Sequence, residues 1–536
     1  MPGPSSPAAD ESPQARRHSP WFDYAVAALI VASPLSKPAT NIALGACALL
    51  FVREWVAGRL RPRATPLDRA IAAWLIVCGL SAVTSIDPLR SFRDLRSIGH
   101  WGVYYFVAWA VAGGASLARL ENLWLAAGSV TAAQALLQGA TGFDLLARGS
   151  AVPTGFFGGH LELGHYMVIL LGLALARWAD ARAERERLLM LLIVLAFGAA
   201  LVISGGRGPW LAFLAFVACW GVAQPSRHAL LALALIVAVQ AIFLVRQPQG
   251  LEAFYRSYVA FEQEEPSSPV AEAQVRSNRW RVEMWREGLR LFALRPVTGT
   301  GVETTGDLSP DFRTPFPDLA VAHLHSNYFE VLLTRGYFGL TAFFLLLIVA
   351  SREIAAGLAV TAAGTSRAAL FAALAGIVGH VVHGLTHFTI GSSWIQIGFY
   401  VALGLGIGQM LNSVGSRASR EWRIEAGTVA WGLGTLGVAF ITVPWLAAHP
   451  LAATLLSMAA AVDIGARWAI GSATALDAAL AAAFAFVVVA AFVLLIPVPD
   501  TRDLAVRVMV AGAGPFAVAH LGQRLAVVLP RSQPRG

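Results

Sequence analysis

The chain has 536 residues, of which 57% are hydrophobic and only 13% charged, and its formal net charge is +8. Soluble domains average about 25% charged residues, so this composition excludes an ordinary soluble protein. Apolar windows of about 17–25 residues recur without the alternating pattern of an outer-membrane barrel, which indicates membrane-spanning helices.

The three cysteines, Cys47, Cys78 and Cys219, lie in apolar segments without paired spacing. This argues against a disulfide framework, a zinc site or a thiol nucleophile. Arginine supplies every basic residue except Lys37, so the number of arginines is no sign of a phosphate ligand and their position must supply the argument. We expect no cofactor, no metal and no nucleic-acid partner.

Residues 1–20 are polar and rich in proline and serine, which predicts a disordered cytoplasmic tail without a cleavable signal peptide. Residues 21–245 are expected to form the N-terminal transmembrane helices, beginning with a helical hairpin that turns at 34–38. Further spans are expected near 70–86, 101–115, 122–140, 163–178, 187–204, 209–223, 228–245, 326–350, 368–387 and 390–411. The sequence thus predicts an all-α, polytopic bundle of about 12 core helices.

Basic residues gather in alternate polar connections, which the positive-inside rule assigns to the cytoplasm. They lie between 53 and 69, at Arg119, from 177 to 187, at Arg227, Arg352 and Arg367, and from 417 to 423. We therefore expect a multi-pass protein embedded in the lipid bilayer. Residues 246–325 are then a large loop on the outer side, and residues 326–411 are the C-terminal core transmembrane helices.

Residues 425–536 contain further apolar runs and an amphipathic tail. They are expected to form an appended hydrophobic module of two to four helices, and no chemistry is apparent in them.

The expected outer loop is too long for a plain connector, and loops of such length are usually functional or disordered. Residues 272–294 have apolar positions at helical spacing, which predicts a helix with a buried stripe of Val275, Val282, Trp285, Leu289 and Phe292. The helix should stop at residues 295–296, before a turn at 298–301 that needs its glycines.

Arg281 lies on or beside this apolar stripe, and an arginine there needs a carboxylate or phosphate partner. A second row on the helix consists of Arg279, Glu283, Arg286 and Arg290. This row either binds substrate or forms a solvated face with internal ion pairs.

The most conspicuous polar stretch is His323-Leu324-His325-Ser326-Asn327, where the loop enters an apolar run interrupted by Glu330 and Arg335. Ionisable groups at that depth are expensive and usually face a cavity or a substrate. This junction is therefore the first candidate site.

Other polar groups are expected on the same outer side. Arg207, flanked by glycines, is either a phosphate ligand or a snorkelling anchor. Arg90, Arg93 and Arg96 recur every three residues and either attract an anionic headgroup or belong to an interfacial helix. His380, His383 and His387 share a helical face and either bind a metal or line a cavity through hydrogen bonds.

Three motif pieces occur in order: Ser-x-x-Arg-Gly at 204–208, Arg-x3-Trp followed by Pro-x2-Gly-x-Gly at 281–301, and His-Ser-Asn-Tyr followed by Gly-x2-Gly at 325–339. Together with the expected helix count, this set resembles the O-antigen ligase and polymerase-type family of bacterial envelope glycosyltransferases, which includes lipid A-core:surface polymer ligases. The resemblance covers about residues 40–411. It implies a GT-C-like fold and glycan transfer from undecaprenyl diphosphate on the periplasmic face, without a metal or a nucleotide sugar. It also implies a protein of the bacterial inner membrane, in which the loop at 246–325 is periplasmic and carries catalytic elements. We expect the protein to be a monomer.

Carried over residue by residue, the resemblance makes His325, Arg281 and Arg207 the catalytic residues, with His323 a second candidate for the base. We add as candidate substrate-binding residues Arg279, Arg286, His323, Asn327, Arg93, Arg96 and Trp285. Arginine forks would neutralise the leaving diphosphate, and a neutral imidazole would take the proton of a sugar hydroxyl, giving an inverted product.

The resulting hypothesis is an O-antigen ligase of lipopolysaccharide biosynthesis, with an undecaprenyl-diphosphate-linked glycan as donor and lipid A-core as acceptor. An O-antigen polymerase or a protein O-oligosaccharyltransferase would use the same donor and remains open. A polysaccharide or lipid transporter is a third alternative, but it predicts inverted repeats and helices broken near the midplane, which the sequence does not have.

Overall fold

A computed structural model describes residues 19–60, 62–150, 152–223, 269–312, 321–361 and 365–414, and every regular element in these ranges is a helix. In chain order the elements are α1 (Pro20–Ala32), α2 (Lys37–Val56), α3 (Asp68–Val83), α4 (Pro88–Asp94), η1 (Leu95–His100), α5 (Trp101–Ala112), α6 (Leu117–Thr141), α7 (His160–Asp180), α8 (Glu184–Ile203), α9 (Arg207–Ala223), α12 (Pro269–Phe292), η3 (Ser309–Asp311), α13 (Asn327–Val360), α14 (Thr365–Val382), η4 (His383–Leu385), η5 (Thr389–Gly391) and α15 (Ser393–Val414). The all-α prediction is confirmed for the described residues.

Six of the described helices are long and apolar enough to cross a bilayer: Lys37–Val56, His160–Asp180, Glu184–Ile203, Asn327–Val360, Arg367–Leu385 and Ser393–Asn412. The chain is therefore a membrane protein with several spans. Each span expected inside the described ranges coincides with a helix, including the hairpin of α1 and α2. The total of about 12 core helices stays a prediction. The expected span at 228–245, most of the tail at 1–20 and the module at 425–536 lie outside the described residues.

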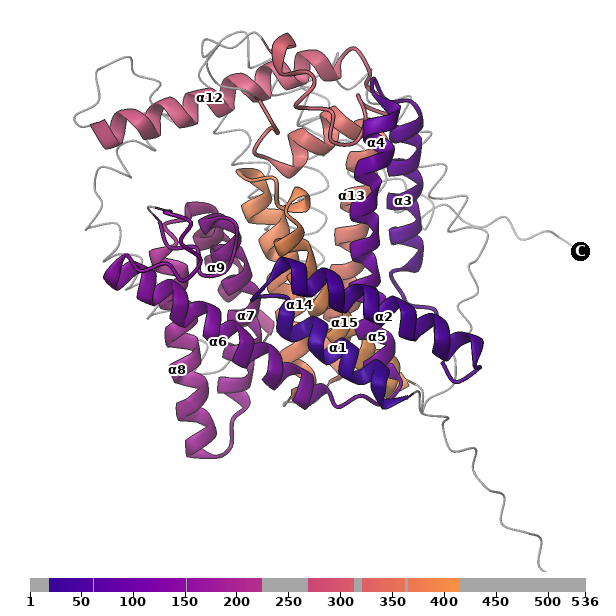
Figure 1. Cartoon of the computed structure of the whole chain (residues 1–536), viewed down its shortest axis with the longest axis vertical. Coiled ribbons are helices and arrows are strands. Elements are labelled where there is room, and N and C mark those ends of the chain that lie inside the picture. The colour runs from indigo at the N-terminus through magenta and orange to yellow at the C-terminus, as the bar shows by residue number, and fades with distance from the viewer. Residues whose placement is uncertain are drawn as a thin grey trace, which may run out of the picture.

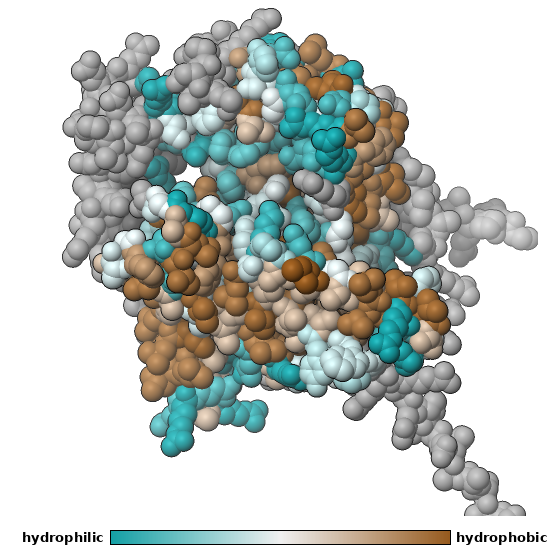
Figure 2. Space-filling model, in the orientation of Figure 1, coloured by the Kyte–Doolittle hydropathy of each residue, from teal (hydrophilic) through white to brown (hydrophobic). Residues whose placement is uncertain are grey.

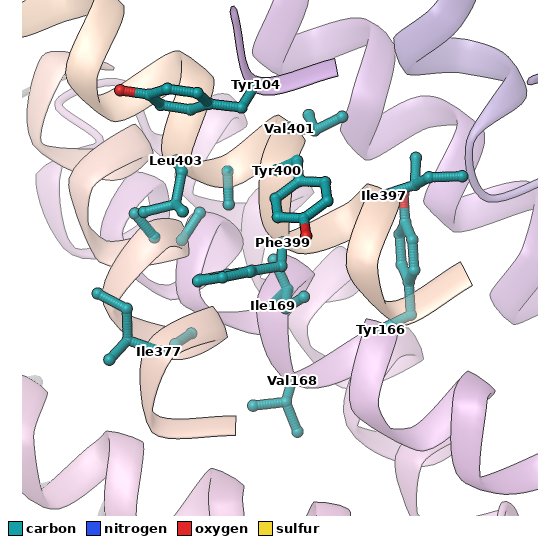
Figure 3. Packing of buried hydrophobic residues seen from close by; sticks show 14 of the residues in the cluster. Tyr104, Tyr166, Val168, Ile169, Ile377, Ile397, Phe399, Tyr400, Val401 and Leu403 are labelled. Atoms are coloured by element: carbon teal, nitrogen blue, oxygen red, sulfur yellow. The ribbon is translucent and has the colours of Figure 1, made fainter. Parts of the chain in front are cut away.

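The centre of the bundle is made by α7, α14 and α15. In their apolar windows 78%, 89% and 78% of the residues are buried, against 22% in α2 and in α8. Figure 3 shows Phe399 and Tyr400 of α15 packed near Ile169 of α7 and Ile377 of α14. The central helices can therefore carry polar groups away from lipid, whereas α2 and α8 present apolar side chains outward.

The two ends of the bundle differ. The arginine-rich connection between α7 and α8 lies at the end opposite to α12, which extends across the other end of the molecule (Figure 1). Polar surface gathers at both ends in the view of Figure 2, with apolar side chains between them. This arrangement fits the sides that the basic residues predict, and the orientation in a membrane stays a prediction.

α12 forms where the sequence predicts a helix, and it ends at Phe292, just before residues 295–296. Val282, Trp285, Leu289 and Phe292 of the expected stripe are all buried, with exposed fractions of 9% or less. The side chain of Val275 lies outside the described residues. The stripe therefore fixes the face with which α12 packs on α13.

Candidate active site

A glycine turn is inserted into a break in α13. Gly336 has φ 66° and ψ −165°, so it divides the helix into two parts. The backbone of Val297 occupies the gap: a Cβ on Gly336 would lie 2.2 Å from its carbonyl oxygen. In return, Thr300 N–H donates to Leu333 O over 2.9 Å, and Tyr337 N–H donates to Pro296 O over 2.9 Å. The predicted turn at 298–301 is confirmed, and it joins the second motif piece to the third.

Both backbone polar groups of Leu324, in the His323–Ser326 segment, make hydrogen bonds. The backbone N–H of Leu324 donates to Glu330 Oε2 over 2.7 Å, and its carbonyl oxygen accepts from Trp285 Nε1 over 2.7 Å. Glu330 also accepts from the hydroxyl of Thr305 over 2.6 Å, and Trp285 stacks on Phe329 with ring centroids 4.9 Å apart. These contacts fix the backbone that presents the two histidines.

His325 and His323 are not equivalent. His325 has a left-handed backbone with φ 49°, a conformation that costs a non-glycine residue about 1–3 kcal/mol. Its N–H donates to Nδ1 of His323 over 3.2 Å. A ring nitrogen that accepts a hydrogen bond carries no proton, so neutral His323 is protonated at Nε2. His323 can then donate from Nε2, while only His325 keeps a ring lone pair for a proton.

Further histidines adjoin this pair. The ring of His387 lies 6.5 Å from that of His325 and 6.3 Å from that of His323. It stacks on His383 at 4.9 Å, and Nδ1 of His383 lies 2.9 Å from Nδ1 of His165 in α7. For His380, His383 and His387 the metal alternative finds no support, because the described residues contain no group of three or more potential ligands that could hold a metal ion.

Sequence reasoning placed the histidines of 380–387 on the outer side but did not connect them to His325. The signal was present in the topology, since the end of α14 and the start of α13 were both expected on that side. Asn327 makes the connection: its amide donates to His380 O and Thr389 Oγ1 and accepts from the N–H of Ile390. Which faces would meet required the packed structure.

Arg281 lies beside the histidines. Burial is the main cause that lowers the pKa of His325 to about 3, and the charge of Arg281, with those that His323 and His387 would carry if protonated, contributes to this value. Burial also lowers the pKa of His387 to about 3, followed by the charges of His323, Arg281 and His160, and burial and Arg281 lower the pKa of His323. The Arg281 Nε is buried and has no hydrogen-bond partner among the described residues. The site is therefore cationic around neutral imidazoles.

Arg207 begins α9, and its side chain is exposed. The neighbouring Gly208 lies against the ring of His383, because a Cβ there would come within 2.3 Å of its Cδ2. Nδ1 of His160 donates to the carbonyl oxygen of Ser204 over 2.7 Å, so the start of α7 joins the same area. The Ser204–Gly208 piece thus borders the histidine cluster that extends from His325.

The second row of α12 contains ion pairs within the helix. Arg286 pairs with Glu283 at 3.0 Å and Arg290 with Glu287 at 2.7 Å. These pairs agree with the solvated-face alternative, and Arg279 is likewise exposed. Binding of substrate by Arg279 or Arg286 stays a prediction.

The remaining candidates are Arg93, Arg96, Asn327 and Trp285. Arg93 is exposed on α4, and the side chain of Arg96 in η1 lies outside the described residues. Their neighbour Arg90 pairs with Asp307. The polar atoms of Asn327 and Trp285 are occupied by protein partners, so substrate could bind to them only if these bonds broke. Substrate binding by these four residues stays a prediction.

Comparison with known proteins bears on this geometry. A family model described as O-antigen ligase matches residues 167–344. This range extends from α7 to the second part of α13 and includes all three motif pieces, together with Arg207, Arg281 and His325. A search of curated proteins gave no match. The chain is thus a membrane protein whose residues 167–344 belong to the O-antigen ligase family of membrane glycosyltransferases.

Proposed function

We propose that this protein transfers a polysaccharide from undecaprenyl diphosphate to a sugar hydroxyl of lipid A-core on the periplasmic face of the inner membrane. The observation that carries the proposal is the fixed backbone that presents His323 and His325 where the charge of Arg281 acts on both rings. Leu324, the residue between the two histidines, is bonded at both its N–H and its carbonyl oxygen. Such fixed placement is what a general base requires, because a misplaced base loses most of its effect.

The donor determines what the arginines must do. When the sugar–oxygen bond breaks, its electron pair leaves with the diphosphate and negative charge grows on the bridging oxygen. A guanidinium binds two phosphate oxygens and stays charged at every relevant pH. Arg281 would supply one such contact, and Arg207, beside the cluster on α9, a second. The loss of one contact of this kind typically costs about 3–4 kcal/mol of transition-state stabilisation.

The acceptor determines what the histidine must do. A sugar hydroxyl is a poor nucleophile until its proton is removed, and general-base catalysis contributes about 10²–10⁴-fold in rate. The pKa of His325 is lowered to about 3, so its ring is neutral at physiological pH and able to take the proton. The approaching diphosphate dianion stabilises the imidazolium as it forms. His323, protonated at Nε2, is suited to donate a hydrogen bond to the same oxygens.

Direct attack by the acceptor hydroxyl predicts inversion at the anomeric carbon. Nuclear magnetic resonance of the purified product should show the anomeric configuration opposite to that of the lipid-linked donor. Retention would require a glycosyl-enzyme intermediate and would contradict the role given to His325.

The acceptor is tested by offering the purified protein, in detergent, undecaprenyl-diphosphate-linked O-antigen with or without lipid A-core, and sizing the products on a gel. Lipid A-core that carries O-antigen supports the ligase. Elongated lipid-linked glycan with unmodified lipid A-core indicates a polymerase instead. Absence of any product from folded protein would favour a transporter, since a flippase forms no glycosidic bond.

A further inference from the structure

One ring nitrogen of the proposed base lacks the partner that its task requires. Nδ1 of His325 is buried and makes no hydrogen bond to any described residue. If Nε2 keeps the lone pair that receives the proton, then Nδ1 of the neutral ring carries a hydrogen. A buried N–H without an acceptor destabilises the folded protein. An acceptor beside Nδ1 would remove this cost and hold the ring in the reactive tautomer.

The described groups around His325 leave a single candidate for that acceptor. Arg281 and Trp280 adjoin the ring, but a guanidinium and an indole N–H only donate. His323 has its one lone pair on Nδ1, and that nitrogen already accepts the backbone N–H of His325. His387 remains, and its Nδ1 is likewise buried without a hydrogen-bond partner in the described part of the chain.

His387 is held at a defined place. It stacks on His383 with ring centroids 4.9 Å apart and planes 12° from parallel. His383 in turn is fixed by the 2.9 Å contact of its Nδ1 with Nδ1 of His165, and Gly208 leaves room for its ring. Three rings on separate elements therefore support one another, and a fixed partner orients a base better than a mobile one.

The separation of the two rings indicates how they interact. Their centroids are 6.5 Å apart, and the Nδ1 atom of neither ring makes a hydrogen bond to a described residue. Polar groups at such a distance are commonly joined by one water molecule, and two buried nitrogens without partners provide the polar site that a water needs.

We propose that His387 is the positioning residue of the base: its Nδ1 lone pair accepts the Nδ1–H of His325 through one water and keeps the Nε2 lone pair of His325 turned toward the acceptor hydroxyl. The inference rests on the proposed transferase function. In the step, the hydroxyl proton moves to Nε2 of His325 as the new carbon–oxygen bond forms. The bond to the diphosphate oxygen breaks, and its electron pair leaves with the diphosphate. His387 stays neutral throughout, in agreement with a pKa lowered by burial to about 3.

Three substitutions at one position test this role. His387→Leu removes the acceptor at similar size, His387→Asn places an amide oxygen near Nδ1, and His387→Gln places one nearer to Nε2. We expect His387→Leu and His387→Gln to lower kcat about 10–100-fold, the usual loss when a histidine loses its orienting partner. The KM for undecaprenyl-diphosphate-linked O-antigen should stay within about twofold, since His387 does not bind the donor. His387→Asn should recover kcat to within about fivefold of the unsubstituted protein.

His100 offers a matched control. It is a partly buried histidine outside the cluster that bonds Gln396 through Nδ1, so His100→Leu should leave kcat unchanged. Equal kcat in the Asn and Gln variants at position 387, or wild-type kcat in His387→Leu, would overturn the proposal. If His387→Leu does not fold, the ratio of kcat in His387→Asn to kcat in His387→Gln tests the proposal alone. Wild-type activity in His325→Ala would instead reject the proposed function, which separates the two failures.

Discussion

The indole nitrogen of Trp285 in α12 donates a hydrogen bond to the carbonyl oxygen of Leu324 over 2.7 Å, although 39 positions separate the two residues in the chain. Trp285 is 1% exposed, so neither group has access to bulk water. The bond ties the helix that carries Arg281 to the segment that carries His325. This contact therefore joins the two elements that carry the arginine and the histidine.

Trp285→Phe should keep the stacking on Phe329 but leave the Leu324 carbonyl oxygen unbonded. An unsatisfied buried acceptor costs about 1–3 kcal/mol, so the unfolding temperature in detergent should fall and transfer should slow. Trp220→Phe is the matched control, because Trp220 is equally buried and its Nε1 has no hydrogen-bond partner among the described residues. Similar loss of transfer in both variants would contradict a positioning role for Trp285.

Substitutions of His323 distinguish support of the base from catalysis by the base. The amide oxygen of His323→Asn can still accept the N–H of His325, whereas His323→Ala leaves that N–H unbonded. We expect the Asn variant to retain several times the transfer rate of the Ala variant, measured with purified protein. Equal and complete loss in both would show that His323 itself takes the proton.

The pH dependence follows from the lowered pKa of His325, about 3 against an ordinary value of about 6.5. A base protonates only below its pKa, so kcat/KM of the free enzyme should change less than about twofold between pH 7.5 and 5.5. An ordinary histidine would lose about tenfold over this interval. Such a tenfold fall would contradict the buried, neutral state of the ring.

The same measurement tests the charge of Arg281, which helps to lower the pKa of His325, His323 and His387. Removing a positive charge stabilises a nearby imidazolium and raises its pKa. In Arg281→Gln, the acid limb of the pH profile, where kcat/KM falls as the base is protonated, should therefore move to higher pH. Arg276→Gln, on an exposed part of α12, should leave the limb in place. An unchanged limb in Arg281→Gln would mean that Arg281 does not face the histidines in solution.

Gly336 is expected to tolerate no side chain. In Gly336→Ala, the Cβ would lie 2.2 Å from Val297 O, and the left-handed φ of 66° alone costs about 1–2 kcal/mol. The variant should unfold at lower temperature and release the turn at 298–301. Gly45→Ala is the control, because a Cβ there meets nothing within 4 Å and alanine favours the exposed helix α2. Equal stability of both variants would contradict the inserted turn.

Much of this architecture could be predicted from the sequence. The stripe of Val282, Trp285, Leu289 and Phe292 defines α12 because burial imposes helical spacing on apolar residues. The glycines at 299 and 301 mark their turn because both have positive φ. These signals come from residues close together in the chain, so they can be recognised in a single sequence.

The composition of the site could not be predicted in the same way. That His387 adjoins His325 depends on how η4, just before His387, packs against α9 and α13, and the spacing of residues in the sequence does not predict this packing. The unequal protonation of His323 and His325 depends on one backbone hydrogen bond created by a left-handed residue. Substrate binding by Asn327 and Trp285 stays a prediction, and the hydrogen bonds that both residues make within the protein required the packed structure.

The account is tested most directly by the transfer rate of His325→Ala. Purified protein would receive undecaprenyl-diphosphate-linked O-antigen and lipid A-core in detergent containing a metal chelator, and the rate of attachment would be followed on gels. We expect the unsubstituted protein to transfer with the chelator present and His325→Ala to be about 10²–10⁴-fold slower while remaining folded. Transfer by His325→Ala at the rate of the unsubstituted protein would contradict the assignment of His325 as the base.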